Sequence, residues 1–586
     1  MFQDVKLSSF GGTFIVKAAS DACTPEDLTN EQELIAQTAS QFAEKDVYPY
    51  KQKIDEQNFE LVVRLMKKAG EIGLLAHSVP EAYGGLGLDK VTKGIVGEAL
   101  GKTGSYGVAH ANHTCIATLP ITYFGTKAQK KRYLPKLASG EYIGAYCLTE
   151  PEAGSDALSA RTTAVLNNEK THYILNGTKQ YITSAAFADT FITYAKVDGK
   201  HFTAFIVEKN FQGLSIGPEE KKMGIKGSST CPVIYEDCLV PVDNVLGEVG
   251  KGHVIALNVL NLGRYNLGFA CVGGAKHALE LTLSYTKERK QFQTAIAHFP
   301  ATKEKLALMN ARIYAAESLQ YRTGGLLESV LAGAYENNDP KEAAKSLAQF
   351  AMECSVCKVY SSEAFDTVVD EALQLHGGAG FIQDYEIESV YRDSRINRIF
   401  EGTNEINRLV LPTHFLRKVK SGELVLNQET VEQAYSAIKE GNHLLPLEKK
   451  AVHTVRYLLL LLLSEALKVA KEHIVHEQEA LMKLSNLAIG LYAMESAVIR
   501  TEKAVRKNGK ENEQLKVDLT ELVVDLTMRQ VRDEATQLIN GIATAKKHQA
   551  LHYELQTLMR DFQYEGTFTK TRRVADELIE SGRYTC

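Results

Sequence analysis

The sequence of 586 residues contains no tryptophan, no long apolar run and no excess of basic residues. Its longest leucine run, Leu458 to Leu463, falls far short of the ~20 residues that a membrane-spanning helix needs. The net charge of −5 gives no basic stripe and argues against nucleic-acid binding. No GxGxxG motif follows a strand-like segment, which removes support for a Rossmann cofactor site. We therefore expect a soluble protein that does not bind nucleic acid.

Cysteine usage is sparse and gives no metal-binding pattern. The nine cysteines are scattered, and only Cys354 and Cys357 form a CxxC pair. That pair lies in a helix-like run, Ala343 to Phe365, with no second pair to complete a metal site. We expect reduced cysteines in a reducing compartment and no metal.

The N-terminal segment Met1 to Ala19 lacks a continuous hydrophobic signal core. Asp4 argues against a mitochondrial transit peptide. We therefore expect a bacterial cytoplasmic protein. A processed chain of the mitochondrial matrix or inner-membrane surface is the alternative.

The pattern of apolar residues predicts an α+β protein in four parts. Residues 1–142 are read as an N-terminal helical domain and residues 143–246 as a middle β-domain, a barrel or sandwich. Residues 247–415 are read as a C-terminal helical bundle and residues 416–586 as an extra helical extension. Within the β-domain, Asn176-Gly177 between two alternating segments predicts a hairpin turn.

The extension repeats part of the bundle. Lys305-Leu306, Tyr314-Ala315, Glu317-Ser318 and Arg322-Thr323 recur at a constant offset of 178 residues as Lys483-Leu484, Tyr492-Ala493, Glu495-Ser496 and Arg500-Thr501. We interpret the extension as a degenerate copy of the bundle, with coincidence between two amphipathic helices as the alternative. The segment from Lys449 to Lys471 suits an amphipathic membrane helix, but we expect its leucines to pack onto the core instead.

One carboxylate has the surroundings of a catalytic base. Glu401 follows the apolar Ile399 and Phe400 and precedes Gly402, which leaves space for a ligand. A carboxylate in an apolar, water-poor cavity becomes a stronger base, because desolvation disfavours its charged form. A surface glutamate before a turn is the alternative for this motif taken alone.

Several motifs, in order, give the chain its resemblance to the acyl-CoA dehydrogenase family over residues 30–412. Tyr146 to Pro151 with Gly154-Ser155-Asp156 is similar to the first flavin signature, and Lys221 to Ser228 matches a segment late in the β-domain. Glu288 to Phe292, Gln374 to Gly380 and Tyr391-Arg392-Asp393 complete the resemblance.

The resemblance implies FAD as the cofactor and assigns its contacts. Tyr146, Leu148 and Thr149 would line the isoalloxazine ring, with Ser155 near flavin or substrate, and Tyr181 and Thr183 would flank the ring. Many family members carry tryptophan where Tyr181 stands, but tyrosine keeps a flat stacking face. The remaining implied contacts are Arg289, Phe292, Gln374, Gly377 and Gly378, which would reach the dinucleotide of a neighbouring subunit in a homodimer, and Thr403 and Glu405, which would approach the adenosine half.

The same resemblance implies the reaction: saturated acyl-CoA would be oxidised to trans-2-enoyl-CoA, as in fatty-acid β-oxidation. Glu401 would remove the α-proton, hydride would pass to flavin N5, and electrons would go on to an electron-transfer flavoprotein. Gly263 occupies the position of an alternative base in some members, so Glu401 stands alone. Asn261, Arg264 and Gly402 would lie near the substrate, although a buried helix salt bridge is the alternative for Arg264.

The extension resembles that of the very-long-chain acyl-CoA dehydrogenases, which favours long acyl chains. The alternatives are an acyl-CoA oxidase that passes electrons to O2, a flavin monooxygenase or nucleic-acid-associated relative, and a non-catalytic assembly or scaffold protein of the same fold. Tyr564-Glu565-Gly566-Thr567 repeats the base motif near the C-terminus. No counterpart of the flavin signatures accompanies it, so we read Glu565 as an inherited or fortuitous copy.

Overall fold

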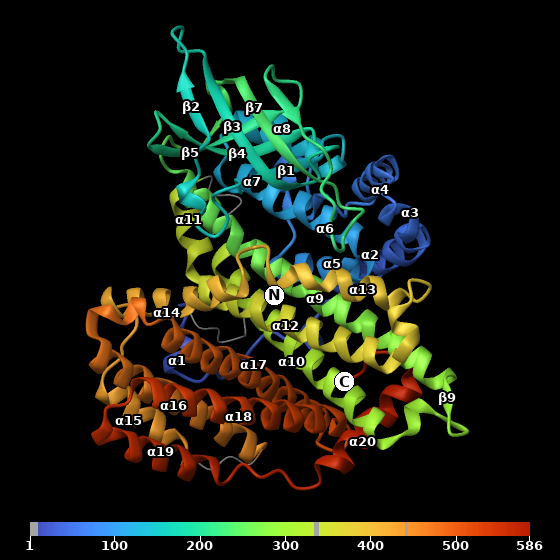
Figure 1. Ribbon diagram of the computed structural model, residues 1–586, viewed down its shortest axis with the longest axis vertical. Coiled ribbons are helices and arrows are strands. Elements are labelled where there is room, and N and C mark those ends of the chain that lie inside the picture. Colours follow the sequence, from blue (N-terminus) through green and yellow to red (C-terminus); the bar gives the residue numbers. More distant parts are fainter. Residues whose placement is uncertain (1–9, 333–338, 440–443) are drawn as a thin grey trace. The chain divides into compact units, whose positions relative to one another are not determined.

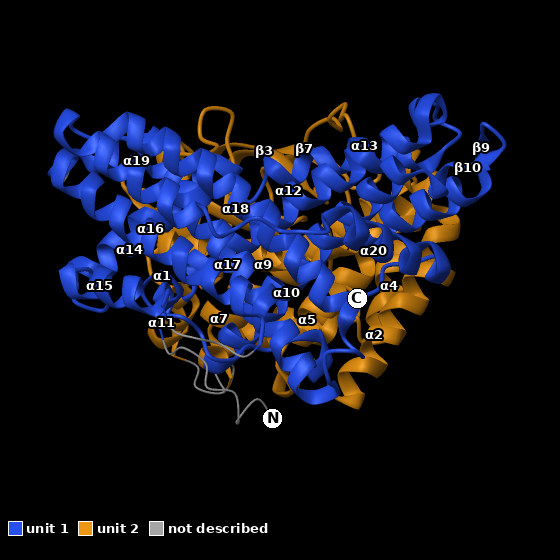
Figure 2. Cartoon of the chain, turned by 90° about the horizontal axis from the view of Figure 1, so that it is seen from below, with its two compact units in different colours: residues 1–28, 275–329, 350–586 blue, residues 29–274, 330–349 orange. Residues whose placement is uncertain are grey.

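A computed structural model describes residues 10–332, 339–439 and 444–586. The chain forms two compact units, coloured separately in Figure 2. The first comprises residues 1–28, 275–329 and 350–586, and the second comprises residues 29–274 and 330–349. Residues 1–9 lie outside the described residues. They include Asp4, from which we argued against a transit peptide.

Helices of the second unit begin with side-chain caps that the local sequence supplies. Thr29 and Gln32 form a reciprocal capping box at the start of α2, and Thr126 and Gln129 do the same for α8. The apolar faces of these helices bury Phe42, among others, in a shared core. The α-helices are α2 (Asn30–Phe42), α3 (Lys51–Asp55), α4 (Phe59–Glu71), α5 (Lys90–Leu100), α6 (Ser105–Ala111), α7 (Leu119–Phe124), α8 (Lys127–Ser139), the first part of α9 (Gly252–Glu288) and α11 (Pro340–Gln349).

The middle of this unit is one mixed sheet, which confirms the predicted β-domain. Its strands are β1 (Gly144–Cys147), β2 (Thr163–Leu166), β3 (His172–Thr183), β4 (Thr190–Val197), β5 (His201–Glu208), β6 (Leu214–Ile216), β7 (Thr230–Pro241) and β8 (Val245–Leu246). They lie in the order β6-β7-β3-β2-β4-β5-β8, with β1 paired in parallel to β4 (Figure 1). Alternate residues of the long strands enter a core that contains Phe191, Phe205 and Tyr235.

The predicted hairpin at Asn176-Gly177 is wrong, because both residues lie inside the continuous strand β3. β3 is paired to β2 on one side and to β7 on the other, so the segment stays extended. The turn-like pair produces a bulge instead, where the register with β7 shifts between Leu175 and Gly177. Gly177 has φ 147°, and a Cβ there would lie 2.6 Å from the Thr162 hydroxyl oxygen.

Three histidines, His77, His110 and His113, are buried among the helices of the second unit. His110 Nε2 lies 3.0 Å from the Leu74 carbonyl oxygen, and the His113 ring lies between the Leu137 carbonyl (2.9 Å) and the Gly144 N–H, which donates to it (3.1 Å). Burial, together with the neighbouring histidine, lowers the pKa of His110 to about 3, and burial lowers the pKa of His113 to about 4. These histidines are therefore neutral in the folded chain at neutral pH.

The first unit is helical apart from a small hairpin, as expected for a bundle with an extension. It contains α1 (Thr13–Val16), the end of α9 (Gly252–Glu288), β9 (Lys290–Gln291), β10 (Thr294–Ala295), α10 (Pro300–Leu331), α12 (Ala351–His376), α13 (Glu386–Ser394), α14 (Asn404–Lys420), α15 (Gln428–Ala437), α16 (Pro446–Ala470), α17 (Gln478–Asn508), α18 (Gln514–Ile542), α19 (Ala545–Met559) and α20 (Thr567–Ser581). Leu458, Leu460 and Leu462 of α16 are buried, so these leucines pack onto the core as expected. No described helix is long and apolar enough to cross a membrane.

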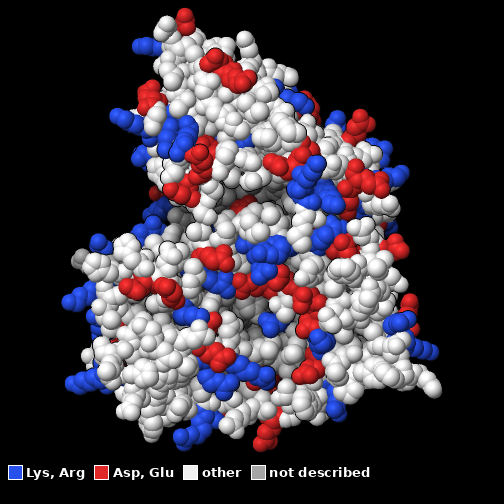
Figure 3. All heavy atoms as spheres, in the orientation of Figure 1, with Lys and Arg blue, Asp and Glu red and all other residues white. Residues whose placement is uncertain are grey.

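The CxxC pair lies in α12, and both Cys354 and Cys357 are buried. The predicted helical run around them is divided, since α11 ends at Gln349 and α12 begins at Ala351. Among the described residues, no group of His, Cys, Asp and Glu is arranged to hold a metal ion. On the face drawn in Figure 3, acidic and basic side chains are interspersed.

The repeated segments on α10 and α17 contact each other reciprocally. Arg322 donates to Glu495 at 2.8 Å, and Arg500, the residue 178 positions later, donates to Glu317 at 2.6 Å. Tyr314 likewise lies 2.6 Å from the Thr501 hydroxyl, while its counterpart Tyr492 lies 2.9 Å from the Thr323 hydroxyl. Each arginine also lies over the ring of the facing tyrosine.

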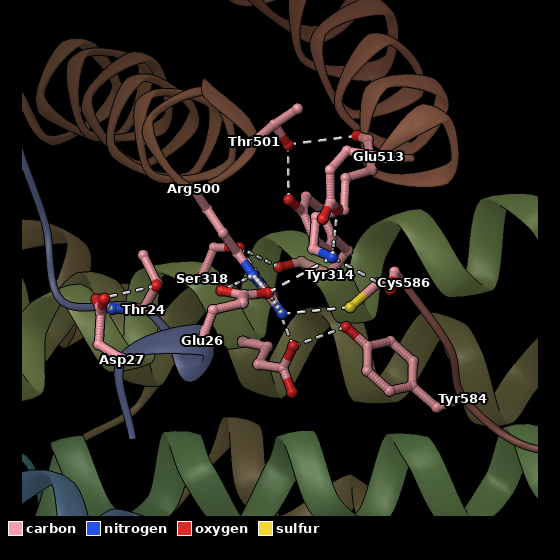
Figure 4. Close-up of polar contacts among 12 residues, drawn as sticks. Thr24, Glu26, Asp27, Tyr314, Ser318, Arg500, Thr501, Glu513, Tyr584 and Cys586 are labelled. Atoms are coloured by element: carbon pink, nitrogen blue, oxygen red, sulfur yellow. Dashed lines mark hydrogen bonds and ion pairs between the residues drawn. The ribbon is translucent and has the colours of Figure 1, made fainter. Parts of the chain in front are cut away.

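Such an exchange of equivalent contacts is the pattern of a two-fold interface, here made within one chain. Figure 4 shows Arg500 reaching from its helix towards Glu26, Ser318 and Cys586. The reciprocity favours the interpretation of the extension as a copy of the bundle. That interpretation and the four predicted domain boundaries stay predictions.

The buried histidines predict a loss of stability in mild acid. The unfolded chain binds protons below the ordinary histidine pKa of about 6.5, whereas folded His110 and His113 do not until about pH 3 to 4. The contribution of these histidines to the free energy of unfolding is therefore fully present above about pH 6.5. It falls by about 1.4 kcal/mol per pH unit for each histidine as the pH drops from about 6.5 towards the folded pKa values. Thermal melting of the His110→Gln variant between pH 5 and 8 should show a shallower slope. The exposed His201→Gln control should keep the parent slope, and equal slopes in all three proteins would contradict the assignment.

The reciprocal ion pairs predict a large cost for removing Glu495. This buried carboxylate accepts from two buried cations, Arg322 and Arg456, which Glu495→Gln would leave without their counter-charge. We expect the free energy of unfolding, from denaturant titration, to fall by about 3–5 kcal/mol. The control Asp576→Asn removes an exposed partner of Lys303 and should cost less than about 1 kcal/mol. Similar losses in both variants would show that the buried pair has no special weight.

Candidate functional site

Glu401 lies in a short loop whose backbone is held in the left-handed region. Glu401 has φ 57° and Gly402 has φ 79°, and only glycine adopts this conformation without strain. Asn407 Nδ2 donates to the carbonyl oxygens of Glu401 (3.3 Å) and Gly402 (2.8 Å). The buried ammonium of Lys358 also donates to the Gly402 carbonyl, at 2.9 Å. Several bonds thus fix the loop, which is what a strained residue needs in order to persist.

The same lysine joins the loop to the first turn of α14. Lys358 Nζ donates to Asn404 Oδ1 at 2.6 Å, and the Thr403 hydroxyl caps the helix by accepting from the Ile406 N–H at 3.2 Å. Glu405 is exposed, and hydrogen bonding to its own backbone N–H lowers the pKa of its carboxyl group. Thr403 and Glu405, the predicted adenosine contacts, therefore both take part in starting α14.

In the second unit, the turn after β1 is held by a buried ion pair. Lys179 donates to Glu150 at 2.6 Å and to the Leu148 carbonyl at 3.3 Å, and it has no exposed surface. Glu150 also accepts from the backbone N–H groups of Arg161 and Thr162. Burial alone would raise the pKa of Glu150, but the charge of Lys179 and the hydrogen bonds outweigh it and lower the pKa. The predicted flavin signature is thus rigidly attached to the sheet.

Two of the predicted ring-lining residues are largely buried. Tyr146 lies at the end of β1 with its ring edge-on to Tyr194, the ring centroids 5.4 Å apart. Tyr146 is 7% exposed and Leu148 is 8% exposed. Only a small part of either side chain is available to a ligand.

Thr149 and Tyr181 lie on adjacent segments near the C-terminal end of β3. The Gln180 N–H donates to the Thr149 carbonyl at 2.9 Å, which joins the turn after β1 to β3. At this point β3 has a second bulge, and Tyr181 has φ 58° with 60% of its surface exposed. Thr183 follows two residues later, paired with Thr230 of β7. An exposed aromatic ring beside a backbone edge suits a flat heteroaromatic ligand.

In the first unit, a glycine turn follows α12 close to Gln374. Gly377 has φ 59°, and a Cβ added at Gly377 or Gly378 would meet nothing within 4 Å. Gln374, Gly377 and Gly378 are exposed, as is Arg289 at the start of the β9–β10 hairpin. Phe292 at the tip of that hairpin is 91% exposed.

These features fit the cofactor that the resemblance implies. Open glycines allow the backbone to approach a ligand closely, and an exposed arginine suits a pyrophosphate. Exposed aromatic faces at Phe292 and Tyr181 suit the flat rings of a flavin dinucleotide. The two residue sets belong to different units, and each fits by itself.

The predicted substrate residues separate into buried and exposed positions. Asn261 and Arg264 are both buried on α9, where Arg264 donates to Asn261 Oδ1 at 3.1 Å. Asn261 Nδ2 donates to the Leu347 carbonyl at 3.3 Å. Ser155, by contrast, is exposed in the turn after Glu150.

Sequence reasoning missed the side chains that hold the loop of Glu401 and Gly402, the predicted base loop. Asn407 had a usable signal, because an Asn in the second turn of a helix can reach back to the preceding loop. Lys358 had none, since it lies on α12 and its partners are set by tertiary packing. For the Glu150–Lys179 pair, the only signal in the sequence was the alternation of residues along β3.

The second Glu-Gly-Thr motif has a different setting. Glu565 is exposed, and Gly566, with φ 69°, stands immediately before α20. Tyr564, unlike Phe400, lies beside the ammonium of Lys570, which is 5.6 Å from its ring centre. This motif starts a surface helix.

Four family models match the chain. The N-terminal, middle and C-terminal domains of acyl-CoA dehydrogenase match residues 29–141, 145–238 and 250–415. A further acyl-CoA dehydrogenase C-terminal domain matches residues 454–558, within the extension.

Individual relatives agree with these matches. A "probable acyl-CoA dehydrogenase" of Bacillus subtilis is 47% identical over 98% of both chains. The human mitochondrial very long-chain specific acyl-CoA dehydrogenase is 37% identical over 66% of this chain and 57% of its own. A crystal structure of an acyl-CoA dehydrogenase complexed with FAD from Bacillus anthracis has a TM-score of 0.96 and 46% identity, covering 98% of this chain and 100% of its own.

Both the Bacillus relatives extend over the whole chain, including the extension, and the fold agrees with that of the solved structure. The chain therefore belongs to the acyl-CoA dehydrogenase family and is an FAD-dependent oxidoreductase of that family.

Proposed function

We propose that the chain catalyses the α,β-dehydrogenation of saturated fatty acyl-CoA to trans-2-enoyl-CoA, with Glu401 as the base. This proposal rests on the loop of Glu401 and Gly402, whose backbone is held in the left-handed region. The loop places a half-buried carboxylate beside a glycine. Bound FAD supplies the hydride acceptor that no protein side chain provides.

Glu401 accepts the α-proton of the thioester. Its side chain is half-buried and follows the apolar Phe400, so a proton can be removed by a carboxylate that is only partly in contact with water. The Glu401 backbone N–H is assigned to the thioester oxygen, on which negative charge develops as the proton leaves. Gly402 leaves the approach to the loop free of a side chain, and Gly263 brings no second carboxylate to the reaction.

The remaining roles are proposals on the same basis. Tyr146, Leu148, Thr149, Ser155, Tyr181 and Thr183 are assigned to the flavin ring, with Ser155, Asn261 and Arg264 assigned also to acyl-CoA. The exposed Arg289, Phe292, Gln374, Gly377 and Gly378 are assigned to the dinucleotide of a second subunit, which makes the homodimer the working form. Thr403 and Glu405 are assigned to the adenosine half of FAD.

We assign the substrate to the long-chain class. A very long-chain specific relative at 37% identity supports this, and its alignment spans 66% of this chain. A solved structure of butyryl-CoA dehydrogenase from Megasphaera elsdenii, 32% identical with a TM-score of 0.59, also matches 67% of the chain. Because relatives of both chain-length classes match, titration with acyl-CoAs of different lengths is the test of the long-chain assignment.

The base assignment predicts the behaviour of the visible spectrum. Anaerobic addition of long-chain acyl-CoA should bleach the bound flavin, and Glu401→Gln should slow the bleaching by about 10²–10⁴-fold, because proton removal loses its base. The matched control Glu565→Gln alters the same Glu-Gly-Thr motif at the surface and should react at the parent rate. Flavin that no acyl-CoA reduces would refute the dehydrogenase and favour the scaffold or monooxygenase alternatives.

The electron acceptor is tested by reoxidation. Substrate-reduced enzyme should be reoxidised rapidly by an electron-transfer flavoprotein and slowly by dissolved oxygen, as followed by the return of flavin absorbance. Fast reoxidation by oxygen alone would identify an oxidase. A solved structure of a prolyl acyl carrier protein oxidase, 30% identical over 66% of this chain, gives that outcome a precedent in the fold.

A further inference from the structure

A continuous series of side-chain contacts joins the extension to the base loop. Glu534 of α18 accepts from Asn486 of α17 at 2.9 Å, and Asn486 Oδ1 accepts from Arg408 Nε of α14 at 2.7 Å. Arg408 forms a two-pronged ion pair with Glu363 of α12, both distances 2.8 Å. Glu363 in turn accepts from Asn404 Nδ2 at 3.0 Å, at the first residue of α14.

Asn404 connects this series to the loop itself. Its Oδ1 accepts from Lys358, which also donates to the Gly402 carbonyl. The Ser485 hydroxyl adds a second link from the extension, since it donates to the Arg408 carbonyl at 2.7 Å. All of these residues belong to the first unit.

Directional polar contacts join α14 to α17 and α12 at this place. A cavity of about 300 Å³ lies beside them, lined by Arg312, Tyr360, Glu363, Arg408, Asn486 and Gln530, among others. The Asn486–Arg408–Glu363 contacts at this cavity are charge-assisted, and they hold the Arg408 side chain in one orientation.

We propose that Arg408 and Asn486 are positioning residues for the base, through which the extension sets the location of the Glu401 loop. The inference rests on the proposed function. Glu401 is a non-glycine residue at φ 57°, a strained conformation that persists only while its neighbours hold it. Displacement of a reacting group by 1 Å can reduce a rate by about 10²-fold.

The test uses the FAD-loaded full chain and measures the rate constant of flavin reduction in a single anaerobic turnover. Asn486→Leu cuts the link on the extension side. Arg408→Lys keeps the positive charge at Glu363 but cannot reproduce the guanidinium geometry, including the Nε bond to Asn486. We expect each variant to reduce the rate constant about 10- to 100-fold. FAD content and the Kd for acyl-CoA should stay at parent values.

Two further readouts separate positioning from a general loss of structure. The isotope effect with α-deuterated acyl-CoA should increase, because proton removal becomes slower relative to the other steps. The double variant should be no slower than the slower single variant, since both changes interrupt the same series of contacts. Asn512→Leu, an exposed asparagine beyond α17 in the same extension, is the matched control and should reduce flavin at the parent rate.

The outcomes distinguish the two proposals. A parent chain that no acyl-CoA reduces overturns the proposed function, and this inference with it. A parent chain that reacts while Asn486→Leu and Arg408→Lys keep its rate overturns the inference alone. So does a loss that Asn512→Leu shares, or one that is accounted for by weaker binding of FAD or acyl-CoA.

Discussion

The helical unit depends on the buried charges exchanged between α10 and α17. Glu317 and Glu495 each accept from two cations, and in each case one of the two is an arginine of the facing helix. Removing one member leaves buried charge without compensation, so the set tolerates no partial loss. The hydrogen-bonded ion pairs are satisfied together in the register that the two helices adopt. Their effect is therefore to fix α17, and with it the extension, at a defined position along the bundle.

That defined position matters because the base loop is not stable by itself. Two successive left-handed residues, one of them Glu401, need external bonds to keep their conformation. Lys358 and Asn407 supply the bonds directly. Asn404 accepts from Lys358, and Glu363 accepts from Asn404 in turn. The reciprocal ion pairs hold α17, and α17 contacts α14 through Ser485 and Asn486, so a shift of α17 would be transmitted to α14.

The parts of the structure that were predictable are those with a local physical signal. The change from helical to alternating periodicity located the β-domain. Glu401 was singled out by its motif together with the family resemblance, and its role as the base stays a prediction. Asn176-Gly177 also had a clear local signal, but pairing to strands on both sides overrode it. Lys358 and Arg408 had no signal at all, because their partners are brought together only by the packing of α12, α14 and α17.

The difference between residues that were predictable and residues that were not has a physical origin. A reacting group must be of a particular chemical type, so its identity is written in the sequence at one position. Its orientation must be right to within a fraction of an ångström, and that depends on groups from several helices. In this chain the carboxylate belongs to the bundle, while one end of the series of contacts that orients it belongs to the extension. On the proposed function, the extension therefore bears on the chemistry as well as on stability, through its contacts with Arg408.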